Sequence, residues 1–302
     1  MPIRALTPWL LAVLALLVPV DALAQNGRSL ALSAECVLLT DPDGRVFFSK
    51  KSDDQHAPAS LVKLMTLYLA YEDLEAGRVH LDDLVSVSRN AATVHRYRMG
   101  LRADTLVPVH TLLEGVAIAS ANDAATALAE KLGGDEATFV ARMNAKAQAL
   151  GLSGTHFANP HGLPDPSQRS TARDLAELTN RLLRDYPDAR TLLGGQTFVF
   201  NGRVYARHIP LFNDPGGVQA LKTGFTNEAG YNLAVSVWRG GQQFVMIVLG
   251  ARTRALSFLD AKKLLRYGFV EVGLDSPAPE SKPRPAAPKR SRSLRPRRAA
   301  TQ

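Results

Sequence analysis

Ser60 and Lys63 form the first residue pair in this sequence whose types and spacing could perform nucleophilic chemistry. They stand at the start of a run, 61–76, that contains no glycine or proline and is apolar nearly all round its first turns. Such a run is typical of a helix buried at the centre of a domain, where residues three apart share one face. Burial lowers the pKa of a lysine, and its neutral amine can then take the proton of a serine hydroxyl. The pair predicts a serine nucleophile with a lysine base, although a core helix whose lysine reaches the surface would show the same spacing.

Ser120 and Asn122 stand between two predicted helices, 110–119 and 123–132. One interpretation is a helix cap, a role for which Asn122 or Asp123 is suited. The other is catalytic: Ser120 would relay a proton to the leaving amine, and Asn122 would orient the substrate amide and the lysine base. Taken alone, this segment favours the cap.

Lys222, Thr223 and Gly224 end a run that is typical of a strand. A lysine and a hydroxyl at a strand edge can hold a substrate carboxylate, and a glycine lets a substrate backbone approach closely. The backbone N–H groups of Phe225 and Ser60 could together form an oxyanion hole, which stabilises the tetrahedral intermediate of acyl transfer. The segment predicts substrate binding, although a lysine–threonine–glycine triplet alone is common by chance.

The three motifs S-x-x-K, S-x-N and K-T-G occur together and in this order, each in the helix, interhelix or strand setting that its chemistry requires. Their joint occurrence indicates a serine acyl-transfer site, which needs neither a metal nor a cofactor. His156 and His161 flank a turn without a third ligand at metal spacing, so we expect structural roles for them.

Strand-like segments open and close the chain, and helical segments fill its middle. We expect helices over much of 80–175, with a capping box at Thr171 and Asp174. Asn201-Gly202 is a strong hairpin signal. The arrangement predicts an α+β fold in which N- and C-terminal strands share one antiparallel sheet. The expected strands are 34–49 as two runs around a turn, 197–200, 203–207, 218–223, 231–238 and 242–249, and a closing helix is expected at 256–269.

The two ends of the chain differ in composition from its body. Residues 1–24 combine an early arginine, an apolar run and an A-x-A site, which is the layout of a secretory signal peptide. We therefore expect the catalytic domain, 25–275, to work outside the cytoplasm, in the periplasm or cell envelope. Its lone cysteine, Cys36, lies in an apolar run and is expected to be a buried small hydrophobe.

The segment 276–302 holds eight lysines and arginines against one glutamate, within a net charge of +8 for the whole chain. It is rich in proline, alanine and serine, so we expect a disordered basic tail. Its charge would attract anionic envelope polymers or lipid headgroups, and an extension without a partner is the alternative. Nucleic-acid binding is not expected of a secreted protein.

The motifs and their flanking residues resemble the D-alanyl-D-alanine carboxypeptidase family of low-molecular-mass penicillin-binding proteins. The resemblance implies the serine β-lactamase/transpeptidase-like fold, an acyl-enzyme on Ser60, peptidoglycan stem peptides as substrates and β-lactams as covalent inhibitors. It also implies that Thr226 joins Thr223 at the substrate carboxylate. The segments that carry the resemblance are 58–66, 120–125, 159–163, 221–226 and 228–233.

Three departures from the family pattern accompany this resemblance. The body ends near Gly273, whereas well-known members continue into a β-rich domain and an amphipathic anchor. Arg252 and Arg254 both follow the strand after which the family places an arginine, so either could serve the terminal carboxylate. The segment 207–210 replaces a stretch that usually contains asparagine.

Four functions are considered for a protein with these motifs. A D-Ala-D-Ala carboxypeptidase is favoured over a D,D-endopeptidase that cuts cross-links, because Lys222, Thr223 and Thr226 can bind a free terminal carboxylate. A β-lactamase of class A would need an E-x-x-x-N arrangement, which the segment 156–162 lacks. A non-catalytic wall-binding protein would not need the intact motifs.

Overall fold

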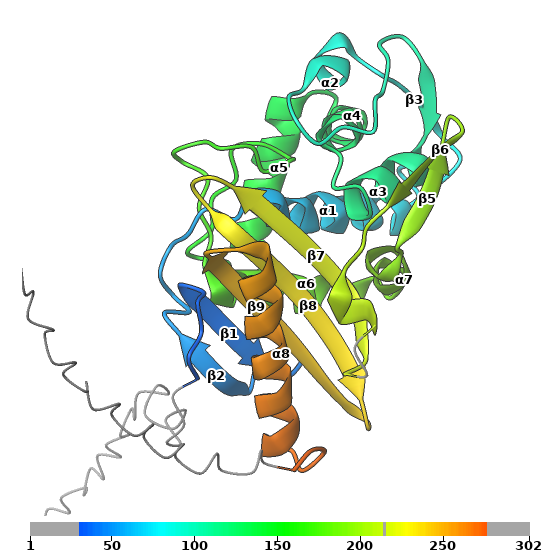
Figure 1. Ribbon diagram of the computed structural model, residues 1–302. Helices are drawn as coiled ribbons and strands as arrows, with labels where there is room; N and C mark the ends of the chain where they lie inside the picture. Colours follow the sequence, from blue (N-terminus) through cyan, green and yellow to red (C-terminus); the bar gives the residue numbers. More distant parts are fainter. Residues whose placement is uncertain (1–29, 214–215, 277–302) are drawn as a thin grey trace, which may run out of the picture.

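A computed structural model describes residues 30–213 and 216–276 of the chain (Figure 1). The predicted signal peptide, 1–24, and all but the first residue of the predicted tail, 276–302, lie outside the described residues. Among the residues described, no helix combines the length and the apolarity that crossing a membrane requires.

A five-stranded antiparallel sheet runs through the centre of the fold in the order β2-β1-β9-β8-β7 (Figure 1). Strand β1 from the start of the chain pairs with β9 from its end, so the prediction of one shared sheet is confirmed. The strands are β1 Cys36–Thr40, β2 Val46–Lys50, β7 Val218–Thr226, β8 Gly230–Arg239 and β9 Gln242–Ala251.

The two faces of the sheet pack into separate cores because side chains alternate along a strand. On β9, Val245, Ile247 and Leu249 face the helical region, whereas Met246 and Val248 face the closing helix. That closing helix, α8 Arg254–Glu271, lies across one face, and α6 Ala172–Asp185 contacts the opposite face (Figure 1). Burial on both faces explains why β8 and β9 are near-continuous apolar runs.

The helical region surrounds α1 Lys63–Glu75, which contacts four other helices and is buried along most of its length. Two small two-stranded sheets accompany it, β3 Leu84–Ser86 with β4 Leu106–Pro108 and β5 Thr197–Phe200 with β6 Arg203–Ala206. The remaining helices are α2 Arg89–Thr93, α3 Val109–Ala117, α4 Asn122–Gly133, α5 Glu136–Ala149 and α7 Asp188–Gly194.

Most predicted elements are present, and the differences have local causes. The hairpin at Asn201-Gly202 is confirmed, with both residues at positive φ as its tight turn requires. The predicted helical content of 80–175 was too high, because β3, β4 and long irregular segments interrupt it. The capping box is only half formed: the Thr171 side chain accepts from the Asp174 N–H, but the Asp174 carboxylate binds the loop before the helix instead.

The buried position of Cys36 in β1 confirms its predicted role as a small hydrophobe. Burial raises the pKa of its thiol, so the reactive thiolate is disfavoured there.

Candidate active site

Ser60 lies in a short 3₁₀ turn, Ala59–Val62, and not in the helix itself, which begins at Lys63. The turn keeps the three-residue spacing that brings the two side chains together, and the Lys63 Nζ lies 3.2 Å from the Ser60 Oγ. The lysine is fully buried, whereas the serine is half-buried and faces the cavities beside it. The helix therefore holds the amine against the hydroxyl from the interior side.

Three neutral oxygen atoms accept hydrogen bonds from the buried Lys63 amine. They are the Ser60 Oγ, the Asn122 Oδ1 at 2.8 Å and the carbonyl oxygen of His161. Burial lowers the pKa of Lys63 to about 7, and the more distant Asp123 carboxylate opposes that shift. A substantial fraction of the amine is therefore neutral near pH 7, as a general base must be.

Asn122 is not a helix cap, so the simpler of the two interpretations was wrong. The N-cap position of α4 belongs to Ala121, which makes no side-chain cap bond. The Asn122 Oδ1 accepts from Lys63, and its Nδ2 donates to the carbonyls of His95 at 3.1 Å and Arg96 at 3.0 Å. One amide side chain thus orients the lysine amine and anchors a distant loop.

Asp123 is buried beside Asn122, and its carboxylate accepts from the Ala124 N–H in the first turn of α4 at 3.0 Å. Its carboxylate accepts from three successive backbone N–H groups at 2.8–3.0 Å, those of Met99, Gly100 and Leu101. These bonds hold the segment 99–101, which follows the loop that Asn122 anchors. Two neighbouring residues of α4 therefore fix the chain from His95 to Leu101.

Lys222 approaches from strand β7 and is as deeply buried as Lys63. Its Nζ donates to the Ser120 Oγ at 2.7 Å and to the Thr223 carbonyl at 2.9 Å. Burial lowers the pKa of Lys222 well below its ordinary value, and the charges of Lys63 and Arg207 lower it further. The structure thus brings Ser60, Lys63, Ser120, Asn122 and Lys222 together, as the motifs predict. They come from the 3₁₀ turn, α1, the segment before α4, α4 itself and β7.

Two glycines allow backbone segments to pack directly on the 3₁₀ turn that carries Ser60. A Cβ on Gly224 would lie 3.0 Å from the Ser60 nitrogen and 3.2 Å from the Pro58 carbonyl oxygen. A Cβ on Gly162, which has φ +88°, would lie 2.1 Å from the Ala59 carbonyl oxygen. Sequence reasoning assigned Gly224 to the approach of a substrate backbone, and the structure adds this tight approach of the protein's own backbone.

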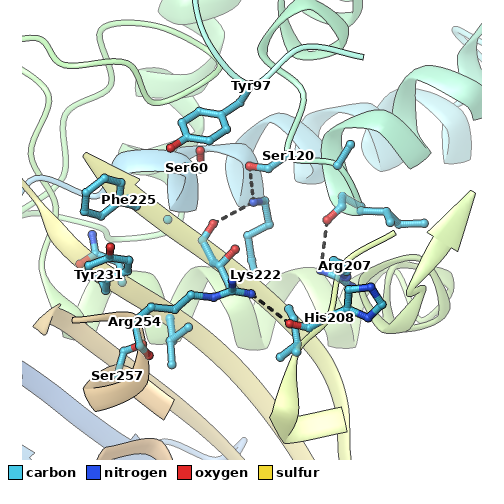
Figure 2. A pocket seen from close by; sticks show the side chains of 18 of the residues that line it. Ser60, Tyr97, Ser120, Arg207, His208, Lys222, Phe225, Tyr231, Arg254 and Ser257 are labelled. Atoms are coloured by element: carbon cyan, nitrogen blue, oxygen red, sulfur yellow. Dashed lines mark hydrogen bonds between the residues drawn. The ribbon is translucent and has the colours of Figure 1, made fainter. Parts of the chain in front are cut away.

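Two cavities meet at Ser60. The first, of about 610 Å³, is lined by Ser120, Lys222 and Thr223 and is the one shown in Figure 2. The second, of about 460 Å³, is lined by Asn122 and Thr226. Both are lined by Phe225 as well as by Ser60.

Thr226 and Thr223 therefore line different cavities. The Thr226 hydroxyl accepts from the Ala229 N–H at 2.9 Å. Their predicted joint contact with one carboxylate is not what this arrangement favours.

Arg254 lines the first cavity, whereas Arg252 is not among its lining residues. It is the first residue of α8 and donates to the His208 carbonyl at 2.9 Å. In Figure 2 its side chain extends across the cavity toward the strand that carries Lys222. Of the two arginines that sequence order left open, Arg254 is the one that lines this cavity.

Arg207 is a component of the site that the motifs did not reveal. Its partly buried guanidinium stacks on Phe212 at 5.2 Å, and burial lowers its pKa to about 10. Sequence reasoning noted only that 207–210 departs from the family pattern, and no spacing signal marked this side chain. Four carbonyls accept from it, those of Gly195 at 2.7 Å, Ala117 at 3.2 Å, Leu221 at 2.9 Å and Leu193.

The two histidines occupy loop positions. The ring of His161 is buried, and burial together with the Lys63 charge lowers its pKa to about 3. His156 pairs with Arg169 through backbone bonds. Within 30–213 and 216–276, no cluster of three histidine, cysteine or acidic side chains could hold a metal ion.

Comparison with known sequences gives a consistent result for most of the chain. The family profile described as D-alanyl-D-alanine carboxypeptidase, peptidase S11, matches residues 23–253. D-alanyl-D-alanine carboxypeptidase DacA of Escherichia coli strain K12 is 37% identical over 246 residues, which are 79% of this chain and 61% of the relative. The chain thus spans less than two thirds of the length of that relative.

Two solved structures show the same similarity in three dimensions. Penicillin-binding protein 5 from Haemophilus influenzae superposes with a TM-score of 0.78 at 34% identity, covering 81% of this chain and 73% of that one. Penicillin-binding protein D2 from Listeria monocytogenes, in its cefotaxime-bound form, gives a TM-score of 0.74 at 30% identity and covers 80% and 100%.

Proposed function

This chain belongs to the D-alanyl-D-alanine carboxypeptidase family, peptidase S11, and we propose that it removes the terminal D-alanine from peptidoglycan stem peptides through an acyl-enzyme on Ser60. The observation that carries the proposal is the Lys63 amine, which is fully buried, 3.2 Å from the Ser60 Oγ and bonded only to neutral oxygens. An amine in that environment is a base for the adjacent hydroxyl.

Acylation begins when neutral Lys63 takes the Ser60 proton. The Oγ attacks the carbonyl carbon between the two D-alanines, and the N–H groups of Ser60 and Phe225 stabilise the resulting oxyanion. Ser120 gives its proton to the leaving amine and recovers one from the ammonium of Lys222, with which it shares a 2.7 Å hydrogen bond. Free D-alanine departs, and the remaining peptide stays as an ester on Ser60.

Deacylation runs the same groups in reverse. Water attacks the ester and passes a proton through Ser120 to the now neutral Lys222. The Lys63 ammonium returns its proton to the departing Ser60 Oγ, so both lysines regain their starting states. No metal or cofactor takes part in these steps.

Recognition of the terminal carboxylate distinguishes a carboxypeptidase from an endopeptidase. The first cavity offers Lys222, Thr223 and Arg254 around one space beside Ser60. An arginine fork and a hydroxyl together suit a free carboxylate, which a cross-linked peptide lacks at this position. This set favours carboxypeptidase activity, with cleavage of cross-links as the alternative.

We expect β-lactams to acylate the same serine. Penicillin-binding protein D2, a structural relative, has been solved in cefotaxime-bound and ampicillin-bound forms. β-Lactamase activity is not favoured, because the loop 156–162 lacks the E-x-x-x-N arrangement. That loop instead supplies the His161 carbonyl to Lys63 and packs Gly162 on the 3₁₀ turn that carries Ser60.

The proposed substrate places the enzyme outside the cytoplasmic membrane, in the periplasm or cell envelope. The predicted signal peptide, 1–24, supports that location. The proposed attraction of the basic tail, 276–302, to anionic envelope polymers would be weakened by salt. Truncating the tail and measuring envelope retention at low salt tests it, and unchanged retention would contradict it.

The decisive experiment offers two substrates to the purified protein, a stem peptide ending in D-Ala-D-Ala and a cross-linked muropeptide. Release of D-alanine that disappears in Ser60→Ala would support the carboxypeptidase proposal. Cleavage of the cross-link alone would assign the protein to the endopeptidases, and turnover of neither would indicate a binding role.

A further inference from the structure

The segment His95–Tyr97 is held beside the nucleophile in an uncommon backbone conformation. Arg96 has φ +55° and Tyr97 has φ +43°, both in the left-handed region that non-glycine residues rarely adopt. Asn122 binds all three carbonyls: its Nδ2 donates to those of His95 and Arg96, and its N–H donates to that of Tyr97 at 2.7 Å.

Such a conformation persists only where the surroundings enforce it, and such places concentrate at functional sites. Here the residue that enforces it, Asn122, also binds the Lys63 amine. The position of the loop is therefore tied to the position of the base. We call His95–Tyr97 the clamped loop.

The clamped loop forms one wall of the second cavity, of about 460 Å³, whose other wall includes Thr226 and Glu228. In the proposed function the leaving D-alanine occupies the first cavity, where Thr223 and Arg254 lie. The part of the peptide that becomes the acyl group must then extend to the other side of Ser60, which is the second cavity. Tyr97 lines both cavities and lies over Ser60 in Figure 2.

Arg96 carries the uncompensated charge of this second cavity. Its side chain is exposed and has no hydrogen-bond or ion-pair partner among the described residues. Glu228 on the opposite wall is compensated, because Arg169 pairs with it at 2.9 Å. The other titratable side chains that line this cavity, His95 and Tyr97, stand on the same wall as the arginine.

We propose that Arg96 is a specificity-determining residue that binds a carboxylate on the acyl side of the substrate, on the residue preceding the D-alanyl pair. The proposal rests on the proposed function and adds a preference to it. A guanidinium fork matches a carboxylate through two parallel hydrogen bonds, and a residue adjacent to the acyl D-alanine lies one step, about 3.5 Å of extended chain, further from Ser60.

The test compares two peptides that end in D-Ala-D-Ala and differ only in the preceding residue, which carries a carboxylate in one and its uncharged amide in the other. The wild type should favour the carboxylate peptide in kcat/KM by on the order of tenfold. Arg96→Gln should lose that preference, and Arg96→Lys, which keeps the charge, should retain part of it. The preference should shrink as salt is added.

The matched control is Arg98→Gln. Arg98 is an exposed arginine two residues along, bonded to the Ala92 carbonyl and outside both cavities, so its loss should leave the preference intact. Acylation by benzylpenicillin, which has no acyl-side carboxylate, reports whether Ser60 and Lys63 stay in place in each variant.

Equal use of both peptides by the wild type, or a preference that survives Arg96→Gln, would overturn the proposal while leaving D-alanine release intact. Loss of penicillin acylation in both Arg96 variants would assign the effect to the loop's backbone and also overturn it. Absence of D-alanine release from either peptide by the wild type would instead remove the proposed function, and this preference with it.

Discussion

Helix α1 buries one charged side chain near each of its ends, and the two ends treat that charge in opposite ways. Near the end of the helix, the Asp73 carboxylate accepts from Arg78 at 2.6 Å and from Arg142 at 2.7 Å. At the start, the Lys63 amine has only neutral oxygens as hydrogen-bond partners among the described residues. Both side chains are almost completely buried, so exposure does not explain the difference.

The carboxylate of Asp73 is ion-paired and stabilises the fold, whereas the amine of Lys63 has no ion-pair partner within the described part of the chain and can exchange a proton. Two guanidinium groups compensate the charge of Asp73, and these two ion pairs connect α1 to Arg78 and Arg142. A carboxylate bonded to Lys63 would raise its pKa and keep the amine protonated. Leaving Lys63 without such a partner costs stability but yields a base with a pKa of about 7.

The largest expected effect comes from Ser60→Ala, which removes the group that the lysine serves. D-Alanine release should fall by about four orders of magnitude or more, because loss of a serine nucleophile leaves only binding and oxyanion stabilisation. Intact-mass measurement with benzylpenicillin should show no adduct on the variant and one on the wild type. Turnover near the wild-type level would show that Ser60 is not the nucleophile.

Lys63→Met should abolish turnover to a similar degree and yet stabilise the fold at pH 6. The folded pKa of about 7 lies below the ordinary 10.5, so between these values the unfolded chain holds a proton that the folded chain lacks. The free energy of unfolding of the wild type therefore rises with pH between about 7 and 10.5. Below pH 7 the buried lysine destabilises the fold by its full amount, at most a few kcal/mol (~1.4 per pKa unit). Denaturant titrations at pH 6 and pH 9 measure this, and a variant less stable than the wild type at pH 6 would contradict it.

Asp73→Ala should lower the stability of the fold and leave turnover nearly unchanged, the opposite of Lys63→Met. Removing the carboxylate leaves Arg142, which is partly buried, without its partner, so unfolding should become easier by about 3–5 kcal/mol. The kcat of the protein that remains folded should change little, since Asp73 lies far along α1 from Ser60. The contrast between the two ends of α1 fails if Asp73→Ala lowers kcat as strongly as Lys63→Met.

The smallest of these effects is the pH dependence of the wild type. Acylation requires neutral Lys63, so the rate of penicillin acylation should rise about tenfold per pH unit below pH 7 and level off above it. Stopped-flow acylation between pH 5 and 9 measures the profile. A rate that stays constant across pH 5–8 would mean that Lys63 is not the group that takes the proton.

The meeting of Ser60 with Lys63 and of Ser120 with Lys222 could be predicted, because each motif confines its chemistry to neighbouring residues. The shared sheet followed from apolar runs near both ends of the chain. The carbonyl partners of Arg207 and of the Asn122 Nδ2 could not be predicted, because packing between distant segments brings them close. The irregular segments within 80–175 were missed for the same reason, since Asp123 holds one of them through bonds that leave no periodic pattern.

The pairing of β1 with β9 has a consequence for how the molecule is made. Strand β1 is synthesised before every other element of the catalytic body, but the strand that it pairs with on one side is the last of the sheet. Contacts between such distant segments close large loops and form slowly. A newly made chain must therefore keep an apolar N-terminal strand half-paired until synthesis nears its end, which makes a partly synthesised chain a natural client for chaperones.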